Sequence, residues 1–387
     1  LVVVAPPEPP GPTTRVEARA LWLTRWDWSD AAGIRALMAG AAHARFNVVY
    51  FQVRARADAY YRSSLEPWSA SLTGTLGTDP GWDPLAVALE EGARHGIQVH
   101  AWLNSLIGWC GSTPPPDSDP PHAFVEHPDW VMVDQAGQPM PYDAGCRWLT
   151  PGQPGVRTRL AAVAADIARH YAVDGVHLDF IRYPDPSWSW DAASLASWEA
   201  ARGDEPSLTF EEHRRRLVTR AVRETRDSLL AARPQARLSA AVWGIYRNER
   251  GWSGVSTGYD DRLQDARAWV AEGLVDVLAP MVYWTIKPGY GDRLDFAYLA
   301  DEHAAAVDTR HVYVGLTAEH IDFAELARQI ERSRVAGAEG VAVLSARLLH
   351  ERGWWEALRQ GPFRDDAVVP AMPWRGEGSL AREGTRR

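Results

Sequence analysis

Strand-like and helix-like segments alternate eight times along this sequence, and this alternation restricts the possible fold more than any other feature. The strand candidates are short apolar runs at 18–24, 46–53, 97–103, 174–180, 237–243, 275–282, 311–316 and 339–345. Segments with helical periodicity lie between them, at about 30–44, 84–95, 154–172, 209–232, 261–272, 295–307, 321–336 and 346–359. Strand followed by helix, repeated eight times, predicts an α/β protein with a (β/α)8 TIM barrel rather than an open doubly wound sheet.

The barrel is predicted to span residues 16–361 as one domain. Two connections, 54–82 after the second strand and 104–153 after the third, are longer than ordinary strand–helix turns. Both follow the C-terminal ends of their strands, where barrel enzymes build their active sites. Long loops at that end are expected to shape a cleft.

The two ends of the chain do not resemble the barrel. Residues 1–15 begin with an apolar tetrapeptide and continue as a proline-rich stretch, which predicts a disordered linker behind a removed signal or lipid anchor. Residues 362–387 are predicted to form an irregular surface tail. We therefore expect a secreted or envelope-associated protein. Cys110 and Cys146 lie in the same long connection, and either a disulfide or two free thiols fits.

Charge and hydropathy exclude some classes of partner. The net charge of -9 and pI near 5.8 argue against a nucleic-acid-binding protein, which needs a basic surface. No apolar run is long enough for a transmembrane helix. The chain contains 19 tryptophans, and their flat rings suit contact with sugar rings as well as packing in the core.

One strand candidate, 174–180, carries an acid and an imidazole within an apolar run. Because side chains alternate between the two faces of a strand, Val176, Leu178 and Phe180 are expected to face the helices. His177 and Asp179 then face the barrel interior. The alternation thus predicts that the acid ends its strand where a ligand can meet it.

The same alternation directs polar residues inward on three further strands. They are Tyr50, Gln52 and Arg54; His100, Trp102 and Asn104; and Tyr313, Gly315, Thr317 and Glu319. An interior built only for stability is filled with Val, Ile and Leu, and unpartnered buried charges cost several kcal/mol. The pattern predicts a ligand-binding mouth. The alternative is a self-contained ion-pair network of Arg54, Asp179 and the histidines.

Motif searches remove several chemistries. The sequence has no HxH or HExxH spacing, no cysteine cluster, no glycine-rich phosphate loop and no GxSxG elbow. We expect no metal and no cofactor, although a metal held by His100, His177 and Asp179 is left as an alternative. Paired carboxylates remain, and glycoside hydrolysis uses such a pair.

Asp179 is the first choice for one member of the pair, as nucleophile or base, and Glu319 is the second choice, as acid. Glu319 can equally be a helix N-terminal acid that the helix dipole stabilises. The reserve acids are Asp27, Asp58 and Glu66. The residues expected to bind substrate are Asp27, Gln52, Arg54, Asp58, His100, Trp102, Asn104, His177, Arg182, Tyr183, Trp243, Tyr283 and Trp284.

Several long stretches carry a family resemblance. They are 21–28 (LWLTRWDW), 46–77, 82–104, 127–132 (HPDWVM), 174–184 (DGVHLDFIRYP) and 275–284 (VDVLAPMVYW). Together they resemble the glycosyl-hydrolase-like family 10 proteins, which are bacterial (β/α)8 barrels that are often exported. The resemblance implies a glycan-directed hydrolase, with cell-wall peptidoglycan-type or other amino-sugar polymers as substrates.

Matching motif positions are Gln52, Arg54, His100, Trp102, Asn104, His177, Asp179, Arg182 and Tyr183. Many relatives have two consecutive acids at the end of the fourth strand, whereas this chain has Leu178 and Asp179 there. Two alternatives to a hydrolase are kept: a non-catalytic glycan-binding barrel and a metal-dependent polysaccharide deacetylase.

Overall fold

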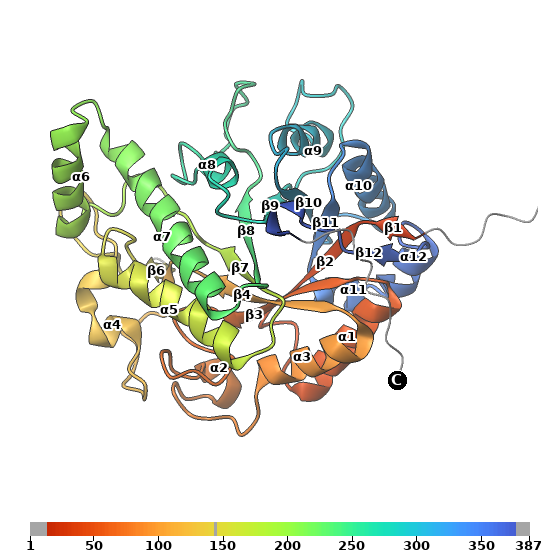
Figure 1. The fold of residues 1–387 in the computed structure, drawn as a ribbon, viewed down its shortest axis with the longest axis horizontal. Helices are drawn as coiled ribbons and strands as arrows, with labels where there is room; N and C mark the ends of the chain where they lie inside the picture. The colour runs from red at the N-terminus through yellow and green to blue at the C-terminus, as the bar shows by residue number, and fades with distance from the viewer. Residues whose placement is uncertain (1–13, 143–144, 377–387) are drawn as a thin grey trace, which may run out of the picture.

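The computed structural model describes residues 14–142 and 145–376. Within these residues, eight parallel strands close into a barrel, which confirms the predicted (β/α)8 fold. In their order around the ring, the strands are β10 (His311–Thr317), β11 (Gly340–Leu344), β2 (Ala18–Leu23), β3 (Val48–Arg54), β4 (Gln98–Asn104), β7 (Gly175–Asp179), β8 (Arg237–Trp243) and β9 (Val277–Met281). Figure 1 shows the strands at the centre of the molecule with the helices outside them.

The outer layer consists of helices that follow the strands in sequence. They are α1 (Ala31–His43), α3 (Pro84–His95), α5 (Pro154–His170), α7 (Phe210–Ala232), α8 (Ala266–Ala271), α9 (Phe296–Ala305), α10 (Phe323–Val335), α11 (Ala346–Glu351) and α12 (Trp354–Gln360). A further helix, α6 (Ala192–Asp204), precedes α7. The single helix predicted at 346–359 is divided in two, because Gly353 adopts a left-handed conformation with φ of 66°.

Helix starts follow the local sequence signals. Asp30 accepts a hydrogen bond from the Gly33 amide at 2.8 Å, and Asp83 accepts one from Ala86 at 3.0 Å, so each aspartate caps a helix N-terminus. Pro84 occupies the first turn of α3, where its missing N–H is no loss. These caps fix where each helix leaves its loop above the barrel.

Two buried clusters separate the inside of the barrel from the layer under the helices. Val176 and Leu178 of β7 belong to the large outer cluster. Trp22, Tyr50 and Trp102 belong to a smaller cluster of inward-facing side chains. For these residues, the side chains that face the barrel interior are therefore the ones that the alternation predicts.

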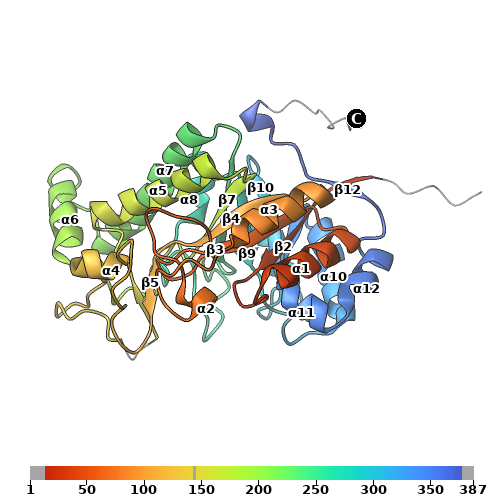
Figure 2. The same ribbon diagram turned by 90° about the horizontal axis from the view of Figure 1, so that it is seen from below.

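The long connection after β4 contains a short antiparallel hairpin, β5 (Ile107–Cys110) with β6 (Cys146–Trp148), and the small helices α4 (Ala123–Glu126) and η1 (Pro128–Trp130). Cys110 and Cys146 form a disulfide across this hairpin. The connection after β3 contains the small helix α2 (Ala70–Thr73). In Figure 2 these loops extend from one end of the barrel, beside α4 and α2.

Part of the predicted C-terminal tail packs on the barrel. Strand β12 (Ala367–Val368) pairs in parallel with β1 (Arg15–Val16), and η2 (Pro373–Arg375) follows. Phe363 and Met372 are fully buried, the latter within the inward-facing cluster. Residues 362–376 thus cover the barrel end that carries β1, whereas 1–13 and 377–387, parts of the predicted linker and tail, lie outside the described residues. No helix in the described ranges has the length and apolarity to cross a membrane.

Candidate active site

A cavity of about 370 Å³ opens at the C-terminal ends of the barrel strands. Strand residues Trp22, Trp102, Ala241 and Met281 line it from below. Gln52, Asn104, Asp179 and Leu344, at or near the C-terminal ends of their strands, also line it. The remaining walls come from the connections that follow the strands; these residues are Thr24, Arg25, Trp26, Ala55, Ile107, Cys110, Cys146, Phe180, Arg182 and Tyr283. A hollow of this size with several aromatic walls and few polar groups is typical of a small-ligand site.

Asp179 ends β7 and lines this cavity with its side chain 10% exposed. Its Oδ1 accepts a hydrogen bond from the Phe180 amide at 2.6 Å and another from Nη1 of Arg182 at 3.2 Å. The backbone carbonyl of Asp179 accepts from the Ser105 amide at 2.7 Å, which ties the end of β7 to the end of β4. Within the described residues, Oδ2 has no recorded donor. The carboxylate is therefore fixed through one oxygen, while the other is left for a ligand.

The alternation of side chains predicts that Phe180 continues the outward face of β7. The structure differs from this prediction. The φ of 49° at Phe180 lies in the left-handed region, and the strand ends one residue earlier. The ring instead lines the cavity, where it packs edge-on against Trp148 and beneath the guanidinium of Arg182. The turn directly after Asp179 thus adds an aromatic wall beside the carboxylate.

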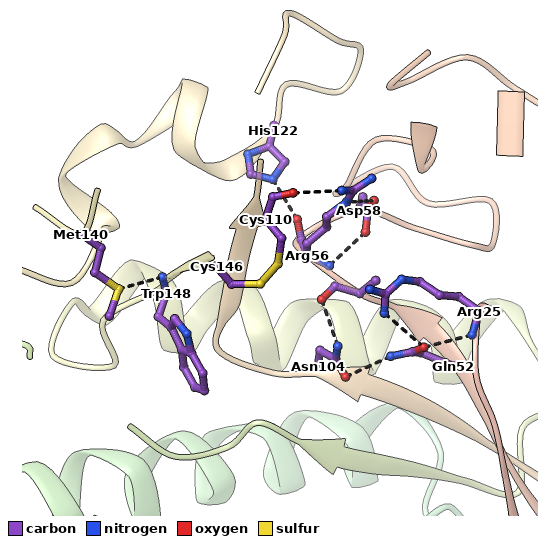
Figure 3. The surroundings of a disulfide bond; sticks show 11 residues. Arg25, Gln52, Arg56, Asp58, Asn104, Cys110, His122, Met140, Cys146 and Trp148 are labelled. Carbon is purple, nitrogen blue, oxygen red and sulfur yellow. Dashed lines mark hydrogen bonds and ion pairs between the residues drawn. A yellow bond between two sulfur atoms is a disulfide. The ribbon is translucent and has the colours of Figure 1, made fainter. Parts of the chain in front are cut away.

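Gln52 and Asn104 form a chain of hydrogen bonds along one side of the cavity (Figure 3). Nε2 of Gln52 donates to Oδ1 of Asn104 at 3.1 Å, and Nδ2 of Asn104 donates to the carbonyl of Ala55 at 3.1 Å. Oε1 of Gln52 accepts from the Arg25 amide at 3.0 Å and from Nη1 of Arg25 at 3.3 Å. Both amides are therefore held rigidly by neighbouring loops.

Arg54 lies away from the cavity, although the alternation of side chains directs it inward. A bulge between Gln52 and Arg54 shifts the register, so that Arg54 pairs with the outward residue Leu103. Its guanidinium lies 2.8 Å from Glu66 Oε1, both side chains are 1% exposed, and Nη1 donates to the Asn104 and Ser105 carbonyls. Arg54 and Glu66 therefore brace the loop at the end of β4.

His177 faces the interior but lies below the cavity, fully buried. Trp22 Nε1, which can only donate, lies 3.0 Å from its Nε2, so its proton is on Nδ1 and is donated to Ser239 Oγ at 2.8 Å. Its ring stacks on Tyr50 with centroids 3.8 Å apart. Burial lowers the pKa of His177 well below its ordinary value, with a smaller contribution from His100. The neutral imidazole therefore holds Trp22, which lines the bottom of the cavity, by accepting its hydrogen bond.

His100 is also buried, and burial lowers its pKa to about 3. Neither of its ring nitrogens has a hydrogen-bond partner among the described residues. Within the described parts of the chain, no three His, Cys, Asp or Glu side chains are grouped as a metal site would require. Because Trp22 and Ser239 occupy both nitrogens of His177, these histidines do not converge on Asp179 as ligands.

The other candidate acids do not line the cavity. The Glu319 side chain is 59% exposed and lies 3.4 Å from His320, beyond β10. Asp58 is fully buried and accepts from the amide and Nε of Arg56. Asp27 lies behind the wall: Thr24 Oγ1 donates to it at 2.6 Å, and burial raises its pKa. Among the described lining residues, Asp179 is the single carboxylate.

Tyr283 lines the cavity next to Asp179. Burial raises the pKa of Tyr283 well above its ordinary value, and the negative charge of Asp179 raises it further. The hydroxyl therefore stays protonated and can donate a hydrogen bond. It contributes a polar group to the β9 side of the cavity.

Three other predicted residues lie outside the lining. Tyr183 is fully buried near Arg214, Trp284 packs on the outer cluster, and Trp243 donates from Nε1 to the Ser256 carbonyl at 2.7 Å. Trp243 also contacts Arg182, whose guanidinium carbon lies 5.5 Å from its ring centroid. Of the predicted site residues, the cavity brings together Gln52, Trp102, Asn104, Asp179, Arg182 and Tyr283.

Sequence reasoning missed the contribution of β2. Trp22, Arg25 and Trp26 all line the cavity, and Trp22 also holds His177. The alternation of side chains, extended to the first strand, would have indicated Trp22, whereas Arg25 and Trp26 lie in the turn after β2, where the alternation does not apply. The pairing of Cys110 with Cys146, left open from the sequence, forms another part of the wall.

Fold and site together define a (β/α)8 barrel whose mouth, in its described lining, holds one carboxylate among aromatic rings. The sequence profile of the family described as Glycosyl hydrolase-like 10 matches residues 17–331. The chain belongs to this family, as its sequence motifs predict.

Two relatives and two solved structures illustrate the likeness. Glycosyl hydrolase YngK of Bacillus subtilis (strain 168) is 29% identical over 92% of this chain and 74% of its own length. Glycosyl hydrolase DigH of Escherichia coli (strain K12) is 26% identical over 73% of this chain and 70% of its own.

Among solved structures, the glycoside hydrolase domain of PgaB (BpsB) from Bordetella bronchiseptica superposes with a TM-score of 0.66 at 16% identity, covering 89% of this chain and 98% of that one. The catalytic domain of a β-amylase from Paenibacillus polymyxa superposes with a TM-score of 0.58 at 11% identity, covering 89% and 98%. At these identities the two structures support the fold alone.

Proposed function

We propose that this protein is a glycoside hydrolase that cleaves an amino-sugar-containing polysaccharide, with Asp179 as the group that transfers the proton. The observation that carries the proposal is the position of Asp179, which ends β7 at the cavity and, among the described residues, is held through Oδ1 only. A proton donor for a glycosidic oxygen must reach the bond, and Oδ2 is the oxygen available for this. Membership of the family supports the same class of reaction.

The mechanism also needs a nucleophile that attacks the sugar. Most glycosidases use two carboxylates, but some act on 2-acetamido sugars with the substrate's own amide oxygen as nucleophile. A cavity whose described lining holds one carboxylate fits this second scheme, with Asp179 as general acid and then base. This agreement is why we favour an amino-sugar substrate. The sequence-based choice of Glu319 as the acid stays a prediction.

The aromatic walls supply the binding surfaces. Trp22, Trp102, Phe180 and Tyr283 present rings to the cavity, and ring faces suit the C–H faces of sugars. Asn104 and Gln52 offer amide groups beside them. We expect these residues to orient the sugar so that the glycosidic oxygen meets Asp179.

Cleavage of defined glycans tests the proposal. Peptide-free cell-wall strands and chitin-type oligosaccharides are incubated with the wild type, with Asp179→Asn and with Glu319→Gln, and the products are read by mass spectrometry. We expect cleavage by the wild type and by Glu319→Gln, and none by Asp179→Asn. Loss of cleavage in Glu319→Gln as well would support the carboxylate pair instead.

A non-catalytic glycan-binding barrel is the second candidate, and the single carboxylate of the described lining favours it. It predicts binding without products. Export to the cell envelope is also a proposal, which the disulfide between Cys110 and Cys146 supports because such bonds persist in oxidising compartments.

A further inference from the structure

We propose that Arg25 and Trp26, in the turn after β2, form a subsite that binds a sugar bearing a carboxylate. This inference rests on the proposed function, because it assigns a substrate class to the same cavity. Both residues line the cavity, but neither has a role in the mechanism above.

The charge of the cavity wall is opposite in sign to that of the whole chain. The described lining contains two guanidinium groups, Arg25 and Arg182, and one carboxylate, Asp179, so its net charge is positive. The protein as a whole has a net charge of -9. A positive cavity in an acidic protein attracts anionic ligands to that position in particular.

Arg25 differs from Arg182 because it has no carboxylate partner among the described residues. Nη1 of Arg25 donates to Gln52 at 3.3 Å, whereas its Nε is buried and without a hydrogen-bond partner. No hydrogen bond to Nη2 is recorded within the described residues. Nη2, beside the buried Nε, is therefore the N–H group of Arg25 that a ligand carboxylate can reach.

An unpaired guanidinium in this position is costly without a ligand. Burial lowers the pKa of Arg25, and the nearby positive charge of Arg56 lowers it further, while Tyr60 and Asp58 oppose the change. Arginine nevertheless remains charged in proteins, so this half-buried cation has no carboxylate of the described residues within ion-pair distance. A bound carboxylate supplies that charge.

Trp26 provides a surface for the sugar ring itself. Its side chain is among the few large apolar ones that are exposed, at 61%. The guanidinium carbon of Arg25 lies 4.3 Å from its ring centroid, so the cation and the platform are adjacent. A sugar that stacks on Trp26 can direct its carboxylate to Arg25.

The turn that carries both residues is fixed before a ligand binds. Asp27 accepts from the Thr24 amide at 3.1 Å and from Thr24 Oγ1 at 2.6 Å, and Thr24 Oγ1 accepts from the Trp26 amide at 3.2 Å. The Arg25 amide is held by Gln52. Such a turn loses little conformational freedom on binding, which favours affinity.

The test compares two probes that differ only at the carboxyl groups: cell-wall oligosaccharides with free carboxyls, and the same oligosaccharides with the carboxyls reduced to uncharged alcohols. Affinities are measured by titration calorimetry in the Asp179→Asn background, so that turnover does not interfere. We expect this protein to prefer the carboxylated probe by about tenfold to a hundredfold, as for hydrogen bonds to a charged group. The preference should weaken as salt is added.

Arg25→Gln should abolish the preference while binding of the reduced probe stays unchanged. Arg25→Lys should keep part of the preference, because the charge remains but the planar guanidinium is lost. Trp26→Ala should lower the affinity for both probes by the same factor. Arg35→Gln, on the surface of α1, is the matched control and should leave the affinities for both probes unchanged.

Equal affinity for the two probes, or an undiminished preference in folded Arg25→Gln, overturns the subsite. Failure of the proposed function looks different: the wild type would cleave neither probe, while the Arg25-dependent preference in binding persists.

Discussion

Arg182 and Asp179 contact each other at the mouth of the barrel, with Nη1 of Arg182 3.2 Å from Oδ1 of Asp179. The Arg182 side chain is 7% exposed and packs over Phe180 and Trp243, with its guanidinium carbon 4.4 Å and 5.5 Å from the two ring centroids. The contact fixes the orientation of the carboxylate relative to the cavity.

Arg182→Gln should therefore lower kcat by about tenfold to a hundredfold, the range for losing a hydrogen bond between charged groups. Arg182→Lys should recover part of this loss, because a cation is restored without the planar fork. The measurement is kcat and KM on a glycan that the wild type cleaves. An unchanged kcat in Arg182→Gln would mean that the contact does not position Asp179.

The buried histidines predict how stability depends on pH. Burial lowers the pKa of His100 to about 3 and that of His303 to about 4, and it lowers that of His177 as well. Each imidazole takes up a proton in the unfolded chain near pH 6.5 but stays neutral in the fold, so acid favours unfolding. The free energy of unfolding should fall as the pH drops from about 6.5 toward 4, by about 1.4 kcal/mol per pH unit for each histidine.

His100→Leu should reduce that slope by the contribution of one proton, because it removes one buried neutral imidazole. Neither ring nitrogen of His100 has a partner among the described residues, so the substitution breaks no hydrogen bond of the ring there. Chemical denaturation at several pH values measures the slope. His320→Leu removes an exposed imidazole and serves as the control. A slope that is unchanged in His100→Leu would contradict the buried neutral imidazole.

The eightfold repeat of strand and helix segments predicted the barrel, and the alternation of side chains along the strands predicted part of the site. It correctly directed His177 and Asp179 inward, because β7 is regular up to Asp179. It failed at Arg54, where a bulge shifts the register, and at Phe180, whose positive φ turns the chain. The bulge accompanies the ion pair of Arg54 with Glu66, which lies outside the strand, and the turn at Phe180 accompanies the hydrogen bond of its amide to Asp179 Oδ1. A period-2 pattern encodes neither irregularity.

Loop contacts were the other part that the sequence left open. The Cys110–Cys146 bridge depends on how the hairpin of β5 and β6 folds back, and spacing alone does not determine this. Residues 362–376 carry no strong periodicity, yet Phe363 and Met372 are buried against the barrel. Weak local patterns were sufficient there because the barrel supplies the apolar surface.

Substitutions in the ion pair of Arg54 and Glu66 should change the stability of the fold without acting directly on catalysis. Their ion pair is buried, so Glu66→Gln leaves a buried guanidinium without its counter-charge and should lower the free energy of unfolding by about 3–5 kcal/mol. The double variant Arg54→Met with Glu66→Leu removes both charges and should cost less than Glu66→Gln alone. Denaturant unfolding measures both. Full stability of Glu66→Gln together with weaker glycan binding would instead place Arg54 in substrate recognition.

The central claim is that Asp179 performs the proton transfer of glycoside cleavage. Its most direct test is the turnover of Asp179→Asn on a glycan that the wild type cleaves, measured together with melting temperature and glycan affinity. We expect kcat to fall by about a hundredfold to ten-thousandfold, the usual contribution of a general acid, while melting temperature and affinity stay close to those of the wild type. Turnover equal to that of the wild type, or loss of the folded state, would contradict the claim.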